Sequence, residues 1–223
     1  MKIVSWNCSG KFREKFSQIQ TFNADIYIIQ ECENPKTTNS RPYSDFAINY
    51  LWIGSNKNKG LGVFCKKEIL LEKNNWNPYC LRHFLPVKIN RKFNLLAIWA
   101  SAPYIEEYYI YQSIHKNKFD INTIIMGDFN SNACWDKKHN TRNHTNTVNE
   151  LKTIGLISAY HEIFHKEHGK ETEATFYLYK DPQKPYHIDY AFLNKKNLRS
   201  FFIPQETTWL KYSDHKPLIL TIT

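Results

Sequence analysis

Short runs of apolar and β-branched residues, separated by polar turn residues, recur along the whole chain. Several runs are continuously apolar instead of alternating, which is typical of strands covered on both faces. The predicted strands are Lys2–Trp6, Ile26–Gln30, Phe46–Ile53, Leu61–Cys65, Pro86–Ile89, Leu95–Ala100, Thr123–Met126, Thr175–Tyr179, Ile188–Leu193 and Leu218–Ile222.

Fewer stretches carry the periodicity of an amphipathic helix. Arg13–Phe22, Glu106–Lys116 and Thr147–Ile154 fit this pattern, and Asn146 and Thr147 are suited to cap the last of them. Many strands with a few interspersed helices predict an α/β sandwich, in which two sheets pack face to face and helices cover the outside. A doubly wound Rossmann sheet is disfavoured, because no glycine-rich turn follows the first strand.

The length and charge of the chain narrow the possible functions. The 223 residues suit one domain spanning 1–223, which buries roughly 70% of its unfolded surface. A formal net charge of +9 favours a polyanionic partner, such as nucleic acid or an anionic membrane surface. The basic residues are dispersed in short pairs, so a Lys-rich surface without a polyanionic partner is the alternative.

Other features bear on where the protein acts. The chain has five cysteines without a CxxC pair, which disfavours a disulfide framework and fits the reducing cytosol. The first predicted strand begins at Lys2, so no signal peptide is expected. No apolar run approaches the ~18 residues that crossing a bilayer requires. We expect a cytoplasmic protein without a membrane span, and a monomer.

Polar side chains follow several of the predicted strands, where a common edge of the fold can bring them together. The signatures are Trp6-Asn7, Gln30-Glu31, Gly127-Asp128-Phe129-Asn130, Tyr186-His187-Ile188-Asp189-Tyr190 and Ser213-Asp214-His215. Carboxylates, carboxamides and one histidine in such positions can converge on a metal ion and a phosphate. This pattern predicts hydrolysis of a phosphate ester.

The acidic members of these signatures are suited to a divalent cation. A cation held by oxygen ligands neutralises a phosphate and stabilises the leaving oxygen. Magnesium suits this role because it takes few protein carboxylates and shares the oxygens of the substrate. Glu31 and Asp214 are the evident hard ligands, although a single strand-end Glu is more often a solvated residue.

The remaining polar groups are suited to handling a proton and a water. Asp128 and Asn130 project to the same side and can hold an attacking water and a phosphate oxygen; an Asx-type turn is the alternative. His215 titrates near neutrality, and Asp189 could orient it and favour its charged form. The pair could then act as acid, base or electrophile, whereas an isolated histidine is usually structural.

The order Trp-Asn, Gln-Glu, Gly-Asp-Phe-Asn, Asp-Tyr and Ser-Asp-His resembles the endonuclease/exonuclease/phosphatase superfamily, over residues 3 to 222. The resemblance implies a four-layer α/β/β/α sandwich and metal-dependent cleavage of phosphoester bonds. It places Asn7, Glu31 and Asp214 at a Mg²⁺ or Mn²⁺ site. Asp128 would activate or position the water, Asn130 would bind phosphate, and Asp189 would orient His215, as implied by the same resemblance.

The resemblance also suggests substrate-binding residues. Trp99 falls near a position where many relatives carry a His or Tyr that touches the phosphate. In abasic-site nucleases that resemble this chain, the stretch holding Tyr186 and His187, with a Thr-Phe pair before it, helps to line the sugar pocket. Phe176 is the counterpart of that Phe, although a core residue of a strand is an equal alternative. Tyr190 replaces the Arg of the Trp-x-Asp-Arg pattern of inositol-phosphate phosphatases, which weighs against that branch.

These features together predict a Mg²⁺- or Mn²⁺-dependent endonuclease or exonuclease acting on DNA in preference to RNA. A phosphatase or phosphodiesterase for a small metabolite, signalling nucleotide or lipid headgroup would use the same site. A non-catalytic nucleic-acid binder is a further alternative. The segment His161-Glu162-Ile163-Phe164-His165 also matches the HExxH signature of zinc peptidases, which makes a peptidase the remote alternative.

Overall fold

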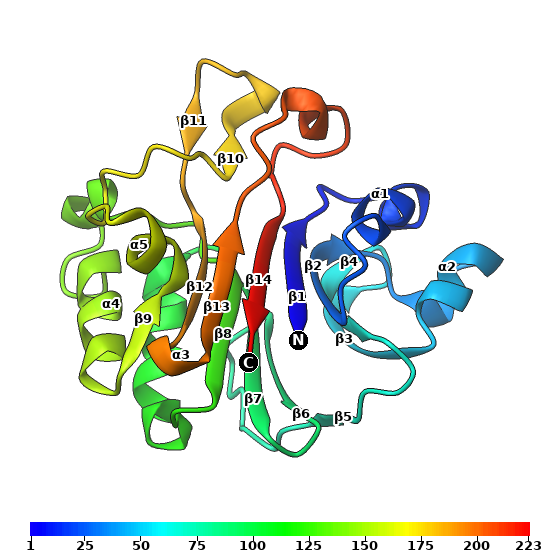
Figure 1. Ribbon diagram of the computed structural model, residues 1–223, viewed down its shortest axis with the longest axis horizontal. Coiled ribbons are helices and arrows are strands. Elements are labelled where there is room, and N and C mark those ends of the chain that lie inside the picture. Colours follow the sequence, from blue (N-terminus) through cyan, green and yellow to red (C-terminus); the bar gives the residue numbers. More distant parts are fainter.

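A computed structural model describes residues 1–223 and shows two six-stranded mixed sheets packed face to face, with helices on both outer sides (Figure 1). This is the four-layer α/β/β/α sandwich that the sequence predicts. The first sheet has the order β13-β14-β1-β2-β4-β3 and the second has β5-β6-β7-β8-β12-β9. None of the helices combines the length and the hydrophobicity that crossing a membrane requires.

The first sheet places the N-terminal strand in its middle, beside the C-terminal strand. The β1–β2 pair is parallel and the other pairs are antiparallel. The Met1 amino group donates to the carbonyl of Ile222 at 2.9 Å, which holds the two termini together. Its strands are β1 (Lys2–Asn7), β2 (Ile26–Cys32), β3 (Asn49–Asn56), β4 (Lys59–Cys65), β13 (Leu198–Phe202) and β14 (Leu218–Ile222).

The second sheet contains one parallel pair, β7–β8, and antiparallel pairs elsewhere. Its strands are β5 (Leu71–Lys73), β6 (Phe84–Ile89), β7 (Phe93–Trp99), β8 (Thr123–Asp128), β9 (Leu156–Ser158) and β12 (Asp189–Asn194). A separate two-stranded hairpin, β10 (Phe176–Tyr177) and β11 (Pro185–Tyr186), projects beyond one end of the sandwich (Figure 1).

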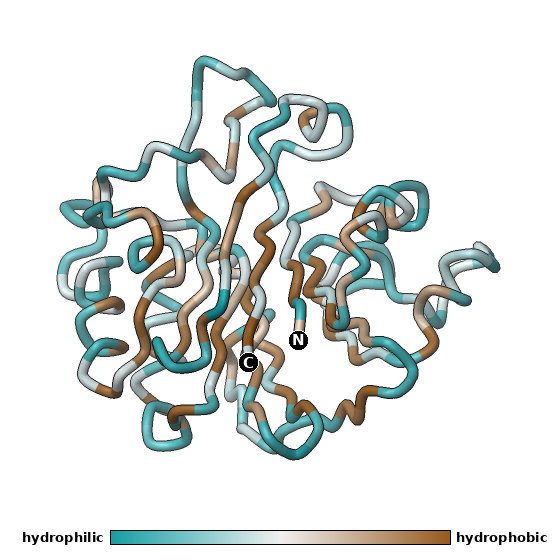
Figure 2. The backbone as a smooth tube through the Cα atoms, in the orientation of Figure 1, coloured by the Kyte–Doolittle hydropathy of each residue, from teal (hydrophilic) through white to brown (hydrophobic).

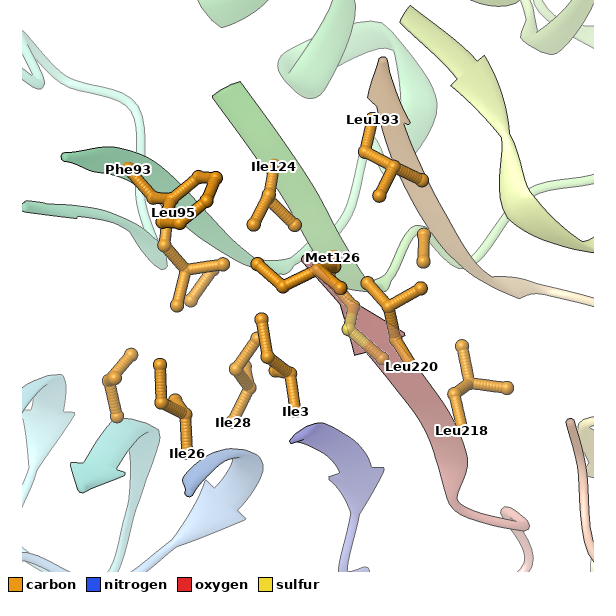
Figure 3. Packing of buried hydrophobic residues seen from close by; sticks show 14 of the residues in the cluster. Ile3, Ile26, Ile28, Phe93, Leu95, Ile124, Met126, Leu193, Leu218 and Leu220 are labelled. Carbon is orange, nitrogen blue, oxygen red and sulfur yellow. The ribbon is translucent and has the colours of Figure 1, made fainter. Parts of the chain in front are cut away.

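Both faces of the central strands are buried, which explains their continuously apolar sequences. In β1, Ile3 belongs to the core between the sheets, whereas Val4 packs under the helices of the first sheet. In β8, Ile124 and Met126 face the first sheet, and Ile125 faces the opposite helices. Figure 3 shows Ile3, Ile26 and Ile28 of one sheet opposite Phe93, Leu95 and Ile124 of the other. Hydrophobic residues accordingly concentrate along the strands, and hydrophilic ones in the outer loops (Figure 2).

The helices divide between the two outer layers. On the first sheet lie α1 (Phe16–Gln20) and α2 (Arg41–Phe46), and on the second sheet lie α3 (Ile105–His115) and α4 (His144–Thr153). Helix α5 (Ala159–Phe164) contributes Ala159 and Tyr160 to the core between the sheets, at its edge.

Several predicted boundaries are wrong. The stretch predicted as one helix from Arg13 breaks into a 3₁₀ turn, Phe12–Glu14, and the short α1. Phe46 ends α2 instead of beginning a strand. Helix α4 starts at His144, three residues before the predicted start, because Asn143 is the cap that accepts from the Asn146 amide at 2.9 Å.

Candidate active site

Asn7 and Glu31 lie side by side because β1 and β2 are parallel neighbours that end at the same edge. Asn7 pairs in register with Gln30, and its Nδ2 lies 3.5 Å from Glu31 Oε1. The same Nδ2 donates to Asp128 Oδ2 at 3.0 Å, which connects the first sheet to the second. Glu31 has a φ of 63°, at the point where the β2–β4 register shifts. This bulge sets Glu31 apart from the regular strand, as is common for side chains next to active sites.

Asp128 is fully buried at the end of β8, and its carboxylate is held by three donors. Oδ1 accepts from the Asn130 amide at 2.8 Å, and Oδ2 accepts from Asn7 Nδ2 and Asn130 Nδ2, each at 3.0 Å. Burial and the neighbouring charge of Asp189 raise the pKa of Asp128 to about 7. Asp128 therefore binds a proton more tightly than an ordinary aspartate does.

Gly127 is required because β7 passes too close for any side chain. A Cβ at this position would lie 2.0 Å from the carbonyl oxygen of Ile98, and the φ of Gly127 is 150°. The neighbouring atom is backbone in a parallel strand pair, so it cannot move aside as a side chain would.

We expect Gly127→Ala to lower the free energy of unfolding by about 3 kcal/mol or more, the upper end of overpacking costs. For a chain of this size that corresponds to a fall of roughly 6–12 °C in Tm. Gly10→Ala is the matched control: Gly10 also has a positive φ, +74°, but a Cβ there would meet nothing within 4 Å. Thermal denaturation of both variants measures the difference, and equal losses would show that backbone conformation alone accounts for the effect.

Asp189 and His215 form a buried pair at the centre of the site. His215 Nδ1 lies 3.0 Å from Asp189 Oδ2 and 3.2 Å from Oδ1, and both side chains are almost fully buried. Burial works against a charged imidazole here, but the carboxylates of Asp189 and Asp128 outweigh it and raise the pKa of His215 to about 10. His215 is therefore an imidazolium at neutral pH.

The loop before β14 attaches His215 and Asp214 to β1. Ser213 Oγ lies 2.6 Å from the Asn7 carbonyl oxygen, accepts from the His215 amide at 3.0 Å, and lies 3.3 Å from Asp214 Oδ1. The Trp6 indole donates to the His215 carbonyl at 2.9 Å. Ser213 thus links the half-buried Asp214 to the backbone of Asn7, and the Asn7 side chain in turn contacts Glu31.

The four residues predicted to be catalytic also lie together. Ligand-type atoms of Asp128, Asp189 and His215 fall within 4.8 Å of one another, since Asp189 pairs in register with Asp128 across β12 and β8. Asn130, with a φ of 47°, donates both of its amide hydrogens inside the protein, to Asp128 Oδ2 and to the Ala100 carbonyl at 3.0 Å. In this arrangement Asn130 positions Asp128, and it can donate to a phosphate only by giving up one of these bonds.

The aromatic residues predicted to bind substrate separate into two groups. The Phe176 ring packs against His215 with 4.7 Å between centroids, and Tyr186 follows it at 6.3 Å. Trp99 pairs with Asp128 in register and stacks on His83 at 4.4 Å. His187 lies apart, because its ring is buried against Tyr160 and its Nδ1 pairs with the Glu173 carbonyl at 2.7 Å. This buried ring, unlike those of Phe176 and Tyr186, does not contact the residues around His215.

Two further residues position these groups: Thr175, which the sequence indicates only as part of a Thr-Phe pair lining a sugar pocket, and Lys59, which sequence reasoning misses. Thr175 Oγ1 accepts from the amides of Ile188 and Asp189, at 3.0 and 3.1 Å, and so fixes the backbone at Asp189. Lys59 Nζ lies 2.8 Å from Glu31 Oε2, although its side chain is half exposed. A lysine at the first position of β4 carries no distinctive sequence signal.

The HExxH segment does not form a zinc-peptidase site. Helix α5 ends at Phe164, and His165 follows in a left-handed conformation with a φ of 54°, exposed to solvent. Glu162 pairs with Lys195 at 2.5 Å. The two histidines of the motif therefore do not lie on one face of a continuous helix, as that chemistry requires.

Comparison with known proteins agrees with this fold and site. The sequence profile described as "Endonuclease/Exonuclease/phosphatase family" matches residues 4–215. The chain therefore belongs to the endonuclease/exonuclease/phosphatase family. A search of curated proteins found no match.

Solved structures share the fold over nearly their whole length. A 3'-5' exonuclease (NExo) from Neisseria meningitidis is 15% identical with a TM-score of 0.70, and the match covers 100% of this chain and 99% of the other. An AP endonuclease from Archaeoglobus fulgidus is 16% identical with a TM-score of 0.69, with the same coverage. The endonuclease domain of TRAS1, a telomere-specific non-LTR retrotransposon, is 17% identical with a TM-score of 0.67, covering 99% and 97%.

Members of this family are hydrolases of phosphoester bonds and generally use divalent metals. The donors at Asn7, Glu31 and Asp214 fit such an ion, since carboxylate and amide oxygens suit Mg²⁺. The Lys59 ammonium beside Glu31 shows that this carboxylate attracts a cation. The Asp128–Asp189–His215 group is less suited, because its facing atoms already bond to one another and to Asn7 and Asn130.

Because Lys59 pairs with Glu31, a predicted metal ligand, we expect Lys59→Met to tighten Mn²⁺ binding in the absence of substrate. A partly exposed ion pair contributes about 1 kcal/mol at most, so the gain should not exceed about fivefold. Lys57→Met removes the same charge from the same hairpin and serves as the control. Calorimetric titration with Mn²⁺ measures the affinities. Unchanged or weaker binding in Lys59→Met would show that the lysine does not compete.

Proposed function

We propose that this protein is a Mg²⁺- or Mn²⁺-dependent nuclease that hydrolyses phosphodiester bonds of DNA. The proposal rests on one observation above all: the buried contact of Asp128 and Asp189 with His215, all within 4.8 Å. An imidazolium held between two carboxylates presents a fixed positive charge and a proton where negative charge develops on a phosphate. That arrangement suits hydrolysis of a phosphate ester better than it suits peptide hydrolysis or binding without turnover.

In the proposed mechanism each residue has a distinct role. Asp128 accepts a proton from the attacking water, whose oxygen forms a bond to phosphorus in line with the breaking bond to the leaving oxygen. Asp189 orients the His215 ring, which stabilises the charge on the phosphate, and Asn130 holds Asp128. Asn7, Glu31 and Asp214 would hold the metal ion, which when bound neutralises the phosphate and stabilises the leaving oxygen.

The surroundings of the site support an anionic and partly aromatic substrate. Burial lowers the pKa of Lys15, with a smaller contribution from the nearby Lys180 charge and an opposing one from Asp214. Lys15, Lys59 and Lys180 thus supply positive charge near the proposed metal ligands, in agreement with the net charge of +9. Phe176 and Tyr186 offer rings on which a sugar or base could pack.

One of the solved structures similar to this chain is a 3' phosphatase (NExo) from Neisseria bound to a product DNA hairpin. This similarity supports DNA as the substrate. That structure is 14% identical with a TM-score of 0.69. The decisive experiment incubates the protein with labelled single-stranded DNA, duplex, abasic duplex, RNA and a soluble phosphate ester, with Mg²⁺ or with a chelator. We expect Mg²⁺-dependent cleavage of at least one DNA and none by Asp128→Ala.

Other outcomes separate the alternatives. Phosphate release from the soluble ester, with every nucleic acid left intact, would identify a small-molecule phosphatase. Binding of DNA that weakens steeply with salt, without turnover, would identify a binder. A peptidase would keep its activity in Asp128→Ala and lose it in His165→Ala.

A further inference from the structure

A second cluster of titratable side chains lies away from the predicted nuclease residues, between α4 and α5 at the edge of the second sheet. It contains His144 at the start of α4, His161 in α5, and His168 and Glu171 in the segment that follows α5. Ligand atoms of His161, His168 and Glu171 all lie within 4.8 Å of one another. The nuclease mechanism uses none of them.

The distances within the cluster suit a four-coordinate metal. Zinc bonds to imidazole nitrogen and carboxylate oxygen are about 2.0–2.1 Å long, so neighbouring ligand atoms in a tetrahedron lie about 3.3 Å apart. His161 Nε2 and Glu171 Oε1 are 3.1 Å apart, and the rings of His161 and His168 stack with 3.5 Å between centroids. The ligand atom of His168, on the segment between α5 and β10, lies within 4.8 Å of the other two, so closing the triangle to 3.3 Å takes a shift of about 1.5 Å at most.

Each ligand also has the supporting partner that a metal site requires. The second ring nitrogen of a ligating histidine normally donates to a neighbouring acceptor. His161 Nδ1 lies 2.7 Å from Ser158 Oγ, and His168 Nδ1 lies 3.1 Å from His144 Nε2, so both rings keep Nε2 for a metal. Asn132 Nδ2 donates to Glu171 Oε2 at 3.0 Å.

Glu171 lacks a permanent cationic partner although it is buried. Its side chain is 3% exposed, and no lysine or arginine lies within 4.0 Å of it. Its nearest side-chain partners are His161 Nε2 at 3.1 Å and Asn132 Nδ2 at 3.0 Å. A buried carboxylate is normally either paired with a cation or bound to a metal ion.

We propose that His161, His168 and Glu171 bind one Zn²⁺ ion, with His144 orienting His168 and water completing the coordination. Two imidazoles favour zinc over the magnesium expected at the oxygen-rich nuclease site. A hollow of about 430 Å³, lined by both histidines, gives the ion a path from solvent. This site takes its first histidine from the HExxH motif but replaces His165 with His168.

The ion would stabilise the wall behind the nuclease site. Asn132 Nδ2, which donates to Glu171, also lies 2.9 Å from the His187 carbonyl oxygen and 3.1 Å from the Tyr190 hydroxyl. These two residues flank Ile188 and Asp189 in the sequence. Zinc would therefore cross-link α5 to the segment that follows it, and Asn132 joins that segment to the chain on either side of Asp189. We expect a structural role and a higher Tm in the zinc-loaded protein.

The test is zinc stoichiometry on chelator-stripped protein, measured by calorimetry and elemental analysis in excess Mg²⁺. We expect wild type to take up one more equivalent than His168→Gln and Glu171→Gln, with affinity at the cluster weakened about 100-fold or more. His165→Gln is the matched control and should match wild type, and so should Glu31→Gln, because that residue lies at the nuclease site. Substituted Co²⁺ should show the visible spectrum of a tetrahedral site.

Circular dichroism shows whether each variant is folded, so that loss of zinc is not mistaken for unfolding. Equal zinc uptake by wild type and both ligand variants would overturn the proposal, as would loss of zinc in Glu31→Gln alone. Absence of zinc uptake by wild type would also overturn the proposal. The cluster would then be a His161–Glu171 ion pair without a metal. Loss in His165→Gln would overturn it in favour of the HExxH motif.

Discussion

Asp128→Asn should lower kcat for DNA cleavage by about 10²–10⁴-fold, the usual contribution of a positioned general base. Asparagine keeps the size of the side chain but cannot take the proton of the attacking water. Its amide would also face Asn7 Nδ2 and Asn130 Nδ2, which now donate to Asp128 Oδ2. Single-turnover cleavage under saturating Mg²⁺ measures the chemical step directly.

Asp45→Asn provides the matched control, since Asp45 is exposed on α2, which covers the first sheet. The control should cleave DNA at the wild-type rate. Both variants should bind DNA and unfold at nearly the wild-type temperature. A rate for Asp128→Asn close to that of wild type would rule out the role assigned to Asp128 here.

His215→Ala and Asp189→Ala should each reduce the rate by orders of magnitude without unfolding the protein. The two residues act as one unit through the 3.0 Å contact between Nδ1 and Oδ2, so the double variant should be little slower than either single one. His165→Gln, an exposed histidine outside the site, should retain full activity. Multiplicative losses in the double variant would mean that the pair acts independently.

The same pair makes a titration prediction. The Asp189 and Asp128 charges raise the pKa of His215 to about 10 against the effect of burial, so the ring stays protonated through neutral pH. Asp189→Asn removes one of these charges, and His215 should then lose its proton at a lower pH. NMR of the ring nitrogens in the metal-free protein measures both titrations. An unchanged or higher pKa in the variant would contradict the coupling.

The sequence predicts the layers of the fold well because the central strands are covered on both sides. A continuously apolar run such as Ile26–Ile29 must be buried on both faces, and in a chain of this size few positions other than a central strand allow this. Local patterns fail where tertiary packing decides the structure. The edge strands β5 and β9 have three residues each, and α5 has six, too few for a period to be visible.

The candidate site could likewise be predicted only in part. The ends of strands are predictable, so Asn7, Asp128 and Asp189 could be placed at one edge from the sequence. The direction in which the His187 side chain points cannot be predicted from the sequence. Its ring packs against Tyr160 and Tyr190, and the folded chain brings these two residues together from different segments. The pairing of Lys59 with Glu31 and of His161 with His168 likewise depends on loops whose paths only the folded structure reveals.

The contact between Ser213 and Asn7, which are 206 positions apart, has a practical consequence. A cut in a loop between Glu31 and Ser213 would leave one piece with Asn7 and Glu31 and another with Asp214 and His215. Neither piece could cleave DNA by the proposed route, yet their re-association on the β1–β14 seam would restore it. The chain is therefore suited to fragment complementation, with recovery of nuclease activity reporting that two fused partners have met.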